Sequence, residues 1–181
     1  MSGKGCFLKQ SLIAHGLPLV LLLAAALVFL THCTTGEKET TSLPAPDFTV
    51  KTLDGRELTL SQLRGKTVLI DFWATWCAPC RESIPHLVHL YKTYDRERFE
   101  LIGMSLDRGD TKAVENFAKS MDIPYPIAIA PEEVAKGFGV TKIPTTIVID
   151  GEGKIQQRIV GFSADVAKQI TAKLDELTAK K

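Results

Sequence analysis

The feature that most constrains this chain is a short apolar run that ends beside two closely spaced cysteines. Residues 68–73 read VLIDFW, and a continuous apolar run of this length between turn residues predicts a strand buried on both faces of a sheet. Apolar residues at 87, 90, 91 and 94 predict a helix from about 78 to 95. Cys77-Ala78-Pro79-Cys80 therefore joins a central strand to the N-terminus of a helix.

The rest of the chain after residue 44 alternates between strand and helix patterns. Asp54-Gly55 is typical of a hairpin turn and separates two short strand-like runs, 48–50 and 57–60. This alternation, followed by a second hairpin and a final helix, predicts an α/β sandwich with a mixed sheet. The further expected strands are 101–106, 126–130, 145–150 and 155–160, and the further expected helices are 111–121, 132–138 and 164–180.

The N-terminal region differs sharply in composition from the remainder. Residues 12–30 form an uncharged stretch of 19 residues, which as a helix would span about 28 Å, close to the thickness of a bilayer's hydrocarbon core. Lys4 and Lys9 precede it without any acid, so the positive-inside rule places the chain after residue 31 outside the cytoplasm. We therefore expect residues 1–33 to be a membrane anchor or signal, 34–43 a flexible linker and 44–181 the folded domain.

Cys33 leaves two kinds of anchor open. Leu30-Thr31-His32-Cys33 resembles a lipoprotein signal, in which Cys33 is lipidated, but such signals carry a small residue where this chain has His32. The alternative is an uncleaved signal anchor. Both tether the domain to the outer face of a bacterial inner membrane. The chain has 22 basic and 21 acidic residues with no basic cluster, which argues against a nucleic-acid partner.

Outside the cytoplasm, an isolated cysteine pair of this spacing could form a zinc site, a structural disulfide or a redox-active disulfide. Zinc needs two further ligands, and the domain's two histidines, His86 and His89, follow on the same helix and cannot fold back to its N-terminus. A structural disulfide here would close a loop too small to restrict the unfolded chain. The pattern therefore favours a redox-active disulfide and a site without metal.

Elementary electrostatics assigns different roles to the two cysteines. Cys77 is expected to be exposed at the helix N-cap, where unpaired N–H groups and the helix dipole stabilise a thiolate. Such a position lowers the pKa of a cysteine from about 8.5 to between about 3.5 and 7.5. Cys77 is therefore the expected nucleophile, and Cys80, one turn further and more buried, is the expected resolving thiol. Ala78 and Pro79 are expected to contact the substrate.

The motif DFWATWCAPC, residues 71–80, resembles the active-site strand and turn of thioredoxins. Residues 44–181 resemble the membrane-tethered, TlpA/ResA-like thiol–disulfide oxidoreductases of the alkyl hydroperoxide reductase/thiol-specific antioxidant superfamily. The resemblance implies a thioredoxin-like three-layer sandwich, with helices on both faces of the sheet and an N-terminal hairpin extension. The other matching motifs are 45–48 (APDF), 53–55 (LDG), 63–66 (LRGK), 138–140 (FGV) and 143–146 (IPTT).

The same resemblance implies roles for residues around the cysteine pair. It implies that Pro144 is cis, which places Ile143 beside the cysteines with its backbone able to pair with an extended substrate strand. Trp76, next to Cys77, is expected either to cover the thiol and contact partners or to pack internally, whereas Trp73 is expected in the core.

Asp71 is a charged residue inside a run that should be buried. Burial raises the pKa of a carboxyl, and the position matches the buried aspartate of thioredoxins, so Asp71 is the expected proton acceptor for Cys80 rather than a strand-edge residue facing water. Two positions depart from related families. The glutamate usual three residues after the second cysteine is Ser83, and the lysine that pairs with the aspartate of cytosolic thioredoxins is Gly103.

The resemblance implies an enzyme that passes electrons from a transmembrane thiol donor to disulfides of exported proteins, with apocytochrome c as the implied substrate class. The dithiol carries two electrons, so no flavin, nicotinamide or metal cofactor is expected. The alternatives are a disulfide oxidant or isomerase, a thiol peroxidase and a copper-delivery module. Peroxidases of this superfamily carry Pro and Thr or Ser where this chain has Ile70 and Ala74, and the copper module needs a wider cysteine spacing and a distal histidine.

Overall fold

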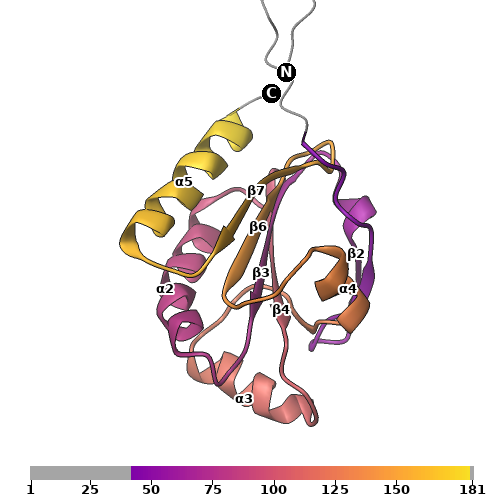
Figure 1. Ribbon diagram of the computed structural model, residues 1–181, viewed down its shortest axis with the longest axis vertical. Helices are drawn as coiled ribbons and strands as arrows, with labels where there is room; N and C mark the ends of the chain where they lie inside the picture. The colour runs from indigo at the N-terminus through magenta and orange to yellow at the C-terminus, as the bar shows by residue number, and fades with distance from the viewer. Residues whose placement is uncertain (1–41, 180–181) are drawn as a thin grey trace, which may run out of the picture. The chain divides into compact units, whose positions relative to one another are not determined.

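A computed structural model describes residues 42–179, and its centre is a mixed sheet with the strand order β5-β4-β3-β6-β7 (Figure 1). The central strand β3 (Thr67–Trp73) is buried along its whole length. On one side of it lie β4 (Phe99–Ser105) and β5 (Ile127–Ile129), both parallel to their neighbours. On the other side lie β6 (Thr145–Ile149) and β7 (Ile155–Val160), which are antiparallel. The predicted mixed sheet is confirmed.

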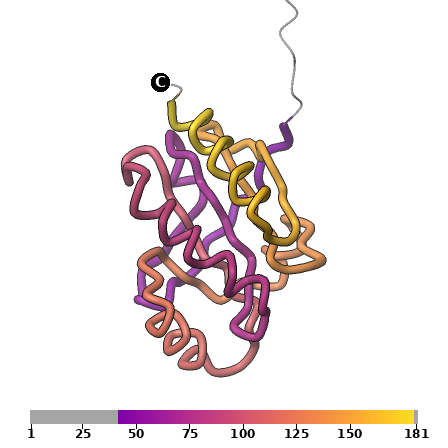
Figure 2. The backbone as a smooth tube through the Cα atoms, turned by 90° about the vertical axis from the view of Figure 1, so that its left-hand side faces the viewer, coloured from indigo at the N-terminus to yellow at the C-terminus, as the bar shows by residue number. Residues whose placement is uncertain are grey.

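Helices cover both faces of this sheet, because successive side chains of each strand point to opposite faces. Leu69 and Trp73 of β3 pack with α2 (Ala78–Thr93), α3 (Thr111–Ser120) and α5 (Ala164–Ala179). Ile70 and Phe72 pack on the other face with α4 (Glu132–Gly137) and with the N-terminal segment. Figure 2 looks onto the face that carries α2 and α5. The predicted three-layer sandwich is confirmed.

The predicted N-terminal hairpin is present as β1 (Thr49–Lys51) and β2 (Glu57–Thr59), which pair antiparallel. A 3₁₀ helix, η1 (Leu60–Leu63), follows at once, although residue 60 was expected to end the strand. Within this helix, the N–H of Ser61 donates a hydrogen bond of 2.9 Å to the Asp47 carboxylate. The side chain of Leu60 is buried beneath it. Such a contact between distant segments cannot be seen in the local pattern.

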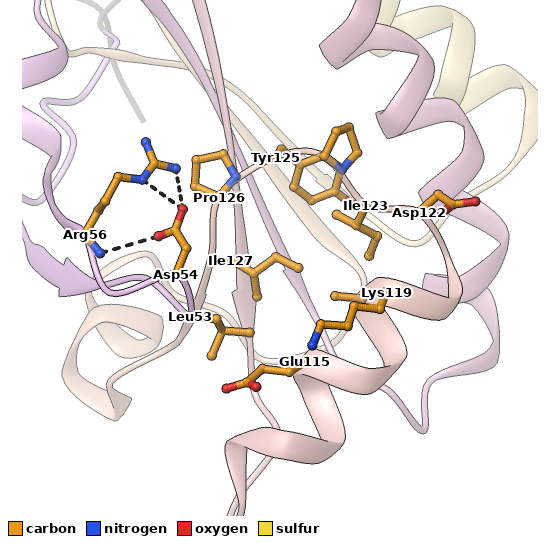
Figure 3. A pocket seen from close by; sticks show the side chains of 12 residues that line it. Leu53, Asp54, Arg56, Glu115, Lys119, Asp122, Ile123, Tyr125, Pro126 and Ile127 are labelled. Carbon is orange, nitrogen blue, oxygen red and sulfur yellow. Dashed lines mark hydrogen bonds and ion pairs between the residues drawn. The ribbon is translucent and has the colours of Figure 1, made fainter.

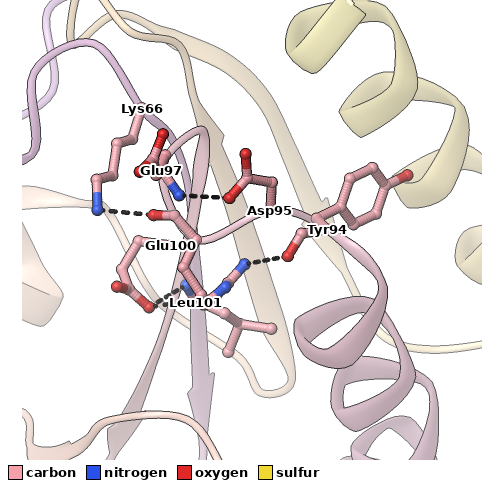
Figure 4. A network of polar contacts seen from close by, with 7 residues as sticks. Lys66, Tyr94, Asp95, Glu97, Glu100 and Leu101 are labelled. Atoms are coloured by element: carbon pink, nitrogen blue, oxygen red, sulfur yellow. Dashed lines mark hydrogen bonds and ion pairs between the residues drawn. The ribbon is translucent and has the colours of Figure 1, made fainter.

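The connection between α2 and β4 fixes the start of the two central parallel strands (Figure 4). Lys66 donates a hydrogen bond of 2.8 Å from Nζ to the carbonyl oxygen of Arg96. The Arg96 guanidinium lies 4.0 Å from the ring centre of Tyr91 and 4.8 Å from that of Phe99, and it contacts Glu100 at 3.5 Å. These cation–π contacts tie the end of α2 to the first residue of β4.

The chain joins the domain at the end of the sheet that is far from the cysteine pair (Figure 1). Pro44 pairs with Lys154, in the turn between β6 and β7, and the N–H of Ala45 donates to the carbonyl of Gly153 at 2.9 Å. This turn lies at the end where β3 begins, because Ile149 pairs with residue 68. The cysteine pair follows the opposite end of β3.

Several predictions concern residues outside the described range 42–179: the apolar segment 12–30, Cys33 and most of the linker 34–43. Within the described range, none of the helices has both the length and the apolar character that crossing a bilayer requires.

Candidate functional site

Cys77 and Cys80 form a disulfide at the N-terminus of α2, with a Cα–Cα distance of 5.2 Å. Cys77 is the N-cap residue, as predicted, and its Sγ accepts a hydrogen bond of 3.3 Å from the N–H of Cys80. Pro79 lies in the first turn, where its lack of an N–H removes no helical hydrogen bond. The sulfur of Cys77 therefore lies where the unpaired N–H groups of the helix converge.

The two cysteines differ in burial in the predicted order, but Cys77 is more buried than expected. Cys80 is 0% exposed and Cys77 is 6% exposed, so the prediction of an exposed Cys77 is wrong for the disulfide state. The reason is that Cys77 packs into the apolar cluster that contains Trp73 and Ala74. The residues next to Cys77 in the sequence are far more exposed than Cys77 itself.

Those neighbours are Trp76, Ala78 and Pro79. Trp76 is 68% exposed, so the internal-packing alternative for this side chain is wrong, whereas Trp73 lies in the core as predicted. Ala78 and Pro79 are exposed as well. Large aromatic and apolar side chains that stay exposed are common at contact surfaces. The roles of these three residues in substrate binding stay predictions.

The Ile143–Pro144 peptide bond is cis, as the resemblance implied. Pro144 immediately precedes β6, and the first residue of β6 pairs with Phe72 near the end of β3, so the turn lies at the same end of the sheet as the disulfide. The side chain of Ile143 packs against the apolar cluster that contains both cysteines. The structure thus brings Ile143 and Pro144 to the cysteine pair, while their functional roles stay predictions.

Asp71 is buried in the middle of β3 and is 1% exposed, so the strand-edge alternative is wrong. Burial raises the pKa of its carboxyl to about 7, and a hydrogen bond from Thr146 opposes this effect only weakly, because its Oγ1 lies 3.5 Å from Oδ1. Oδ2 has no hydrogen-bond partner in the described part of the protein. Asp71 shares the face of β3 that packs under α2, so it lies on the side of the sheet that carries Cys80.

Gly103 lies directly opposite Asp71 on β4, as expected. Its surroundings leave no room for the lysine side chain that cytosolic thioredoxins carry at this position. A Cβ atom at Gly103 would meet Trp73 Nε1 at 3.1 Å and Tyr125 Cε2 at 3.2 Å. The two aromatic rings therefore fill the space that a longer side chain would need. Burial, with a smaller contribution from the charge of Asp71, raises the pKa of Tyr125 well above its usual range.

Ser83 is buried on the face of α2 that carries Cys80. Its Oγ donates a hydrogen bond of 2.8 Å to the carbonyl oxygen of Cys80. Glu82 is exposed, in agreement with the expectation that it points elsewhere. Among the described residues, Asp71 is therefore the only buried acidic side chain on the side of the sheet that α2 covers.

Two polar residues beside the cysteines were not identified from the sequence. Asp107 follows β4 and accepts two hydrogen bonds from Thr75, at 2.9 Å from its N–H and at 2.6 Å from its hydroxyl. Arg81, in the first turn of α2, donates two hydrogen bonds to the carbonyl oxygen of Thr75, at 2.9 and 2.6 Å. The available signal was the position of Asp107 at the carboxyl end of a central parallel strand, where α/β folds concentrate functional residues.

A pocket of about 630 Å³ lies away from the disulfide, between the β1–β2 turn, α3 and the loop before β5 (Figure 3). Leu53 and Ile127 line it, and the ion pair of Asp54 and Arg56, 2.7 Å apart, lies at its rim. Neither cysteine borders this pocket. In the described range, there is no group of three His, Cys, Asp or Glu side chains placed to hold a metal ion.

Comparison with known proteins places this geometry in a wider context. The AhpC/TSA family matches residues 42–158. The thiol-disulfide oxidoreductase ResA of Bacillus thuringiensis subsp. konkukian (strain 97-27) is 35% identical over 158 residues, which cover 85% of this chain and 91% of the relative. Two solved structures are similar as well. A thiol:disulfide interchange protein of Chlorobium tepidum TLS is 32% identical with a TM-score of 0.68, and the match covers 76% of this chain and 97% of that one. A thiol-disulfide oxidoreductase of Bacteroides fragilis NCTC 9343 is 31% identical with a TM-score of 0.64, and the match covers 74% and 98%.

Proposed function

Because this chain belongs to the AhpC/TSA family, and within it resembles the ResA thiol–disulfide oxidoreductases, we propose that it reduces disulfides of exported proteins from a membrane-tethered position outside the cytoplasm. Its activity as a thiol–disulfide oxidoreductase follows from the family and from the Cys77–Cys80 disulfide. The observation that carries the proposal is the position of Cys77 at the N-cap of α2, with the Asp71 carboxyl buried on the side of the sheet that carries Cys80.

The first step is an attack by the reduced Cys77. The N–H groups and the dipole of α2 stabilise its thiolate, which attacks one sulfur of a partner disulfide. A bond forms between Cys77 Sγ and that sulfur, the partner's own S–S bond breaks, and the released partner thiolate takes a proton from solvent. Trp76, Ala78 and Pro79 are the exposed residues that a partner meets as it approaches.

The second step is resolution by Cys80. Its thiol gives a proton to the ionised Asp71, and the resulting thiolate attacks Cys77 Sγ, which releases the second partner thiolate and forms the Cys77–Cys80 disulfide. With a pKa of about 7, the Asp71 carboxyl is able both to accept a proton and to give it up near neutral pH. Two electrons have then passed from Cys77 and Cys80 to the partner, whose two sulfurs are left as thiols.

The tether and the partners rest on the sequence. The apolar segment 12–30 behind Lys4 and Lys9 supports an anchor in the bacterial inner membrane with the domain outside the cytoplasm, and Cys33 leaves lipidation open. A transmembrane thiol donor would return the disulfide to the dithiol. Apocytochrome c is the substrate class that the resemblance to TlpA/ResA-like proteins supports.

Trapping of mixed disulfides tests this proposal. The full-length Cys80→Ser variant retains the attacking thiol but cannot resolve, so its partners should stay covalently attached when it is expressed in cells that make cytochromes c. Cys77→Ser is the matched control and should trap none of them. Captured cytochrome precursors support the reducing role, whereas a broad set of newly exported proteins would instead indicate an oxidant or isomerase. Equal capture by both variants would refute Cys77 as the nucleophile.

A further inference from the structure

Thr75 lies two residues before the attacking cysteine, and both polar groups of its backbone are held by side chains from other elements. The N–H of Thr75 donates to Asp107 Oδ2 at 2.9 Å, and its hydroxyl donates to Oδ1 at 2.6 Å. Asp107 Oδ2 also accepts a hydrogen bond of 2.8 Å from the Ser105 hydroxyl. This carboxylate therefore joins the end of β4 to the loop that precedes Cys77.

Arg81 holds the same residue from the other side. Its Nε and Nη2 donate to the carbonyl oxygen of Thr75 at 2.9 and 2.6 Å, and its own N–H donates to the carbonyl oxygen of Cys77 at 3.2 Å. The guanidinium lies 5.4 Å from the ring centre of Phe117 on α3. Thr75 is thus held between the Asp107 carboxylate, which follows β4, and the Arg81 guanidinium on α2.

The importance of this arrangement depends on the redox state. In the oxidised protein the disulfide itself holds Cys77 against α2. After reduction that bond is absent, and the place of the sulfur near the N–H of Cys80 then depends on the packing of Cys77 in the apolar cluster and on the loop that carries it. Stabilisation of a thiolate by a helix N-terminus falls off within the first turn, so a small displacement of the loop weakens it.

We propose that Asp107 is a positioning residue for thiol–disulfide exchange: through Thr75, it holds the reduced Cys77 sulfur at the N-terminus of α2. The inference rests on the proposed role of Cys77 as the attacking thiol. Asp107 acts by geometry rather than by charge, because a negative charge close to Cys77 would by itself disfavour the thiolate. Its charge is opposed by Arg81, which binds the carbonyl oxygen of the same residue, Thr75.

This difference between geometry and charge allows a decisive pair of variants. In Asp107→Asn, the amide oxygen can accept from the N–H of Thr75, and the amide nitrogen can donate to the Thr75 hydroxyl, so the contacts survive without the charge. In Asp107→Ala, both contacts with Thr75 are lost. Asp150 provides a matched structural control at the far end of the sheet, since its carboxylate accepts from the N–H groups of Glu152 and Lys154, both at 2.9 Å.

The experiment measures how alkylation of Cys77 by iodoacetamide depends on pH in the reduced full-length protein, with fragment mass spectrometry to read that residue alone. We expect the midpoint for Asp107→Ala to rise by about one pH unit, toward the value of a free cysteine. Asp107→Asn should match or fall below the wild type, and Asp150→Ala should leave the midpoint unchanged. Thr75→Val loses only the hydroxyl contact and should show a smaller rise in the midpoint. This variant replaces Asp107→Ala as the test if Asp107→Ala does not fold.

Two results would overturn the inference. One is an unchanged midpoint in both Asp107→Ala and Thr75→Val, which would make the contacts merely structural. The other is an equal rise in Asp107→Asn and Asp107→Ala, which would assign the effect to charge. Failure of the proposed function gives a separate signature, because the wild-type midpoint would then already lie at about 8.5, the value of a free cysteine.

Discussion

Replacement of Asp71 by Asn offers a direct test of the electrostatics at the centre of the sheet. The carboxyl is fully buried, and burial raises its pKa from an ordinary value of 3.8 to about 7. Asn has nearly the same shape but cannot ionise. The variant therefore separates the effect of the charge on stability from the effect of packing.

The sign follows from the number of protons bound in each state. Between pH 3.8 and about 7 the folded protein keeps the proton of Asp71 and the unfolded chain does not, so this group makes the free energy of unfolding fall as pH rises. A displacement of about three pKa units at about 1.4 kcal/mol each amounts to roughly 4 kcal/mol. Below the unfolded pKa the effect is absent, and above about pH 7 it is fully developed.

The assay is urea unfolding of the oxidised wild type and of Asp71→Asn between pH 4 and 8.5. In the disulfide state the cysteines do not titrate, and contributions from histidines cancel in the difference between the two proteins. The stability advantage of the variant should grow by roughly 4 kcal/mol across this range. Asp47→Asn is the control, because a hydrogen bond from Ser61 lowers the pKa of Asp47, so its difference from wild type should stay flat above pH 5.

A flat difference for Asp71→Asn across the same range would refute the reasoning, since it would mean that the carboxyl ionises in the folded protein as readily as in water.

Two further predictions concern the surroundings of the disulfide. Trp76→Ala should leave the urea midpoint nearly unchanged, because the side chain is 68% exposed. The same variant should reduce a protein disulfide, such as those of insulin, several-fold more slowly than the wild type. An unaltered rate would show that Trp76 does not belong to the contact surface. Gly103→Lys should destabilise the protein by about 1–3 kcal/mol in urea unfolding, because its Cβ would crowd Trp73 and Tyr125 at 3.1 and 3.2 Å. A variant as stable as wild type would show that the rings move aside freely.

The elements that could be predicted from sequence are those encoded by local patterns. The buried run 68–73 and the periodicity after Cys80 indicated the central strand and α2, and their junction placed Cys77 at the N-cap. The hairpin turn at residues 54–55 was equally local. The cis bond before Pro144, by contrast, was expected only from the resemblance to a family, because no local pattern distinguishes it from an ordinary trans bond.

What could not be predicted depends on contacts between distant segments. Thr75 and Asp107 are separated by 32 residues, and their hydrogen bonds require the exact pairing of β3 with β4. The burial of Cys77 likewise results from packing against Trp73, and it reversed the expectation of an open thiol. The crowding around Gly103 arises from Tyr125, which lies on a loop that the sequence pattern does not orient.

The pairing of Pro44 with Lys154 has a practical consequence for handling the protein. A bead, tag or surface coupled ahead of residue 42 would be attached at the end of the sheet opposite the cysteine pair, so the support would leave the exposed residues around the disulfide uncovered. A column that carries the protein in this orientation should capture partner proteins whose approach would be blocked by a support coupled near α2.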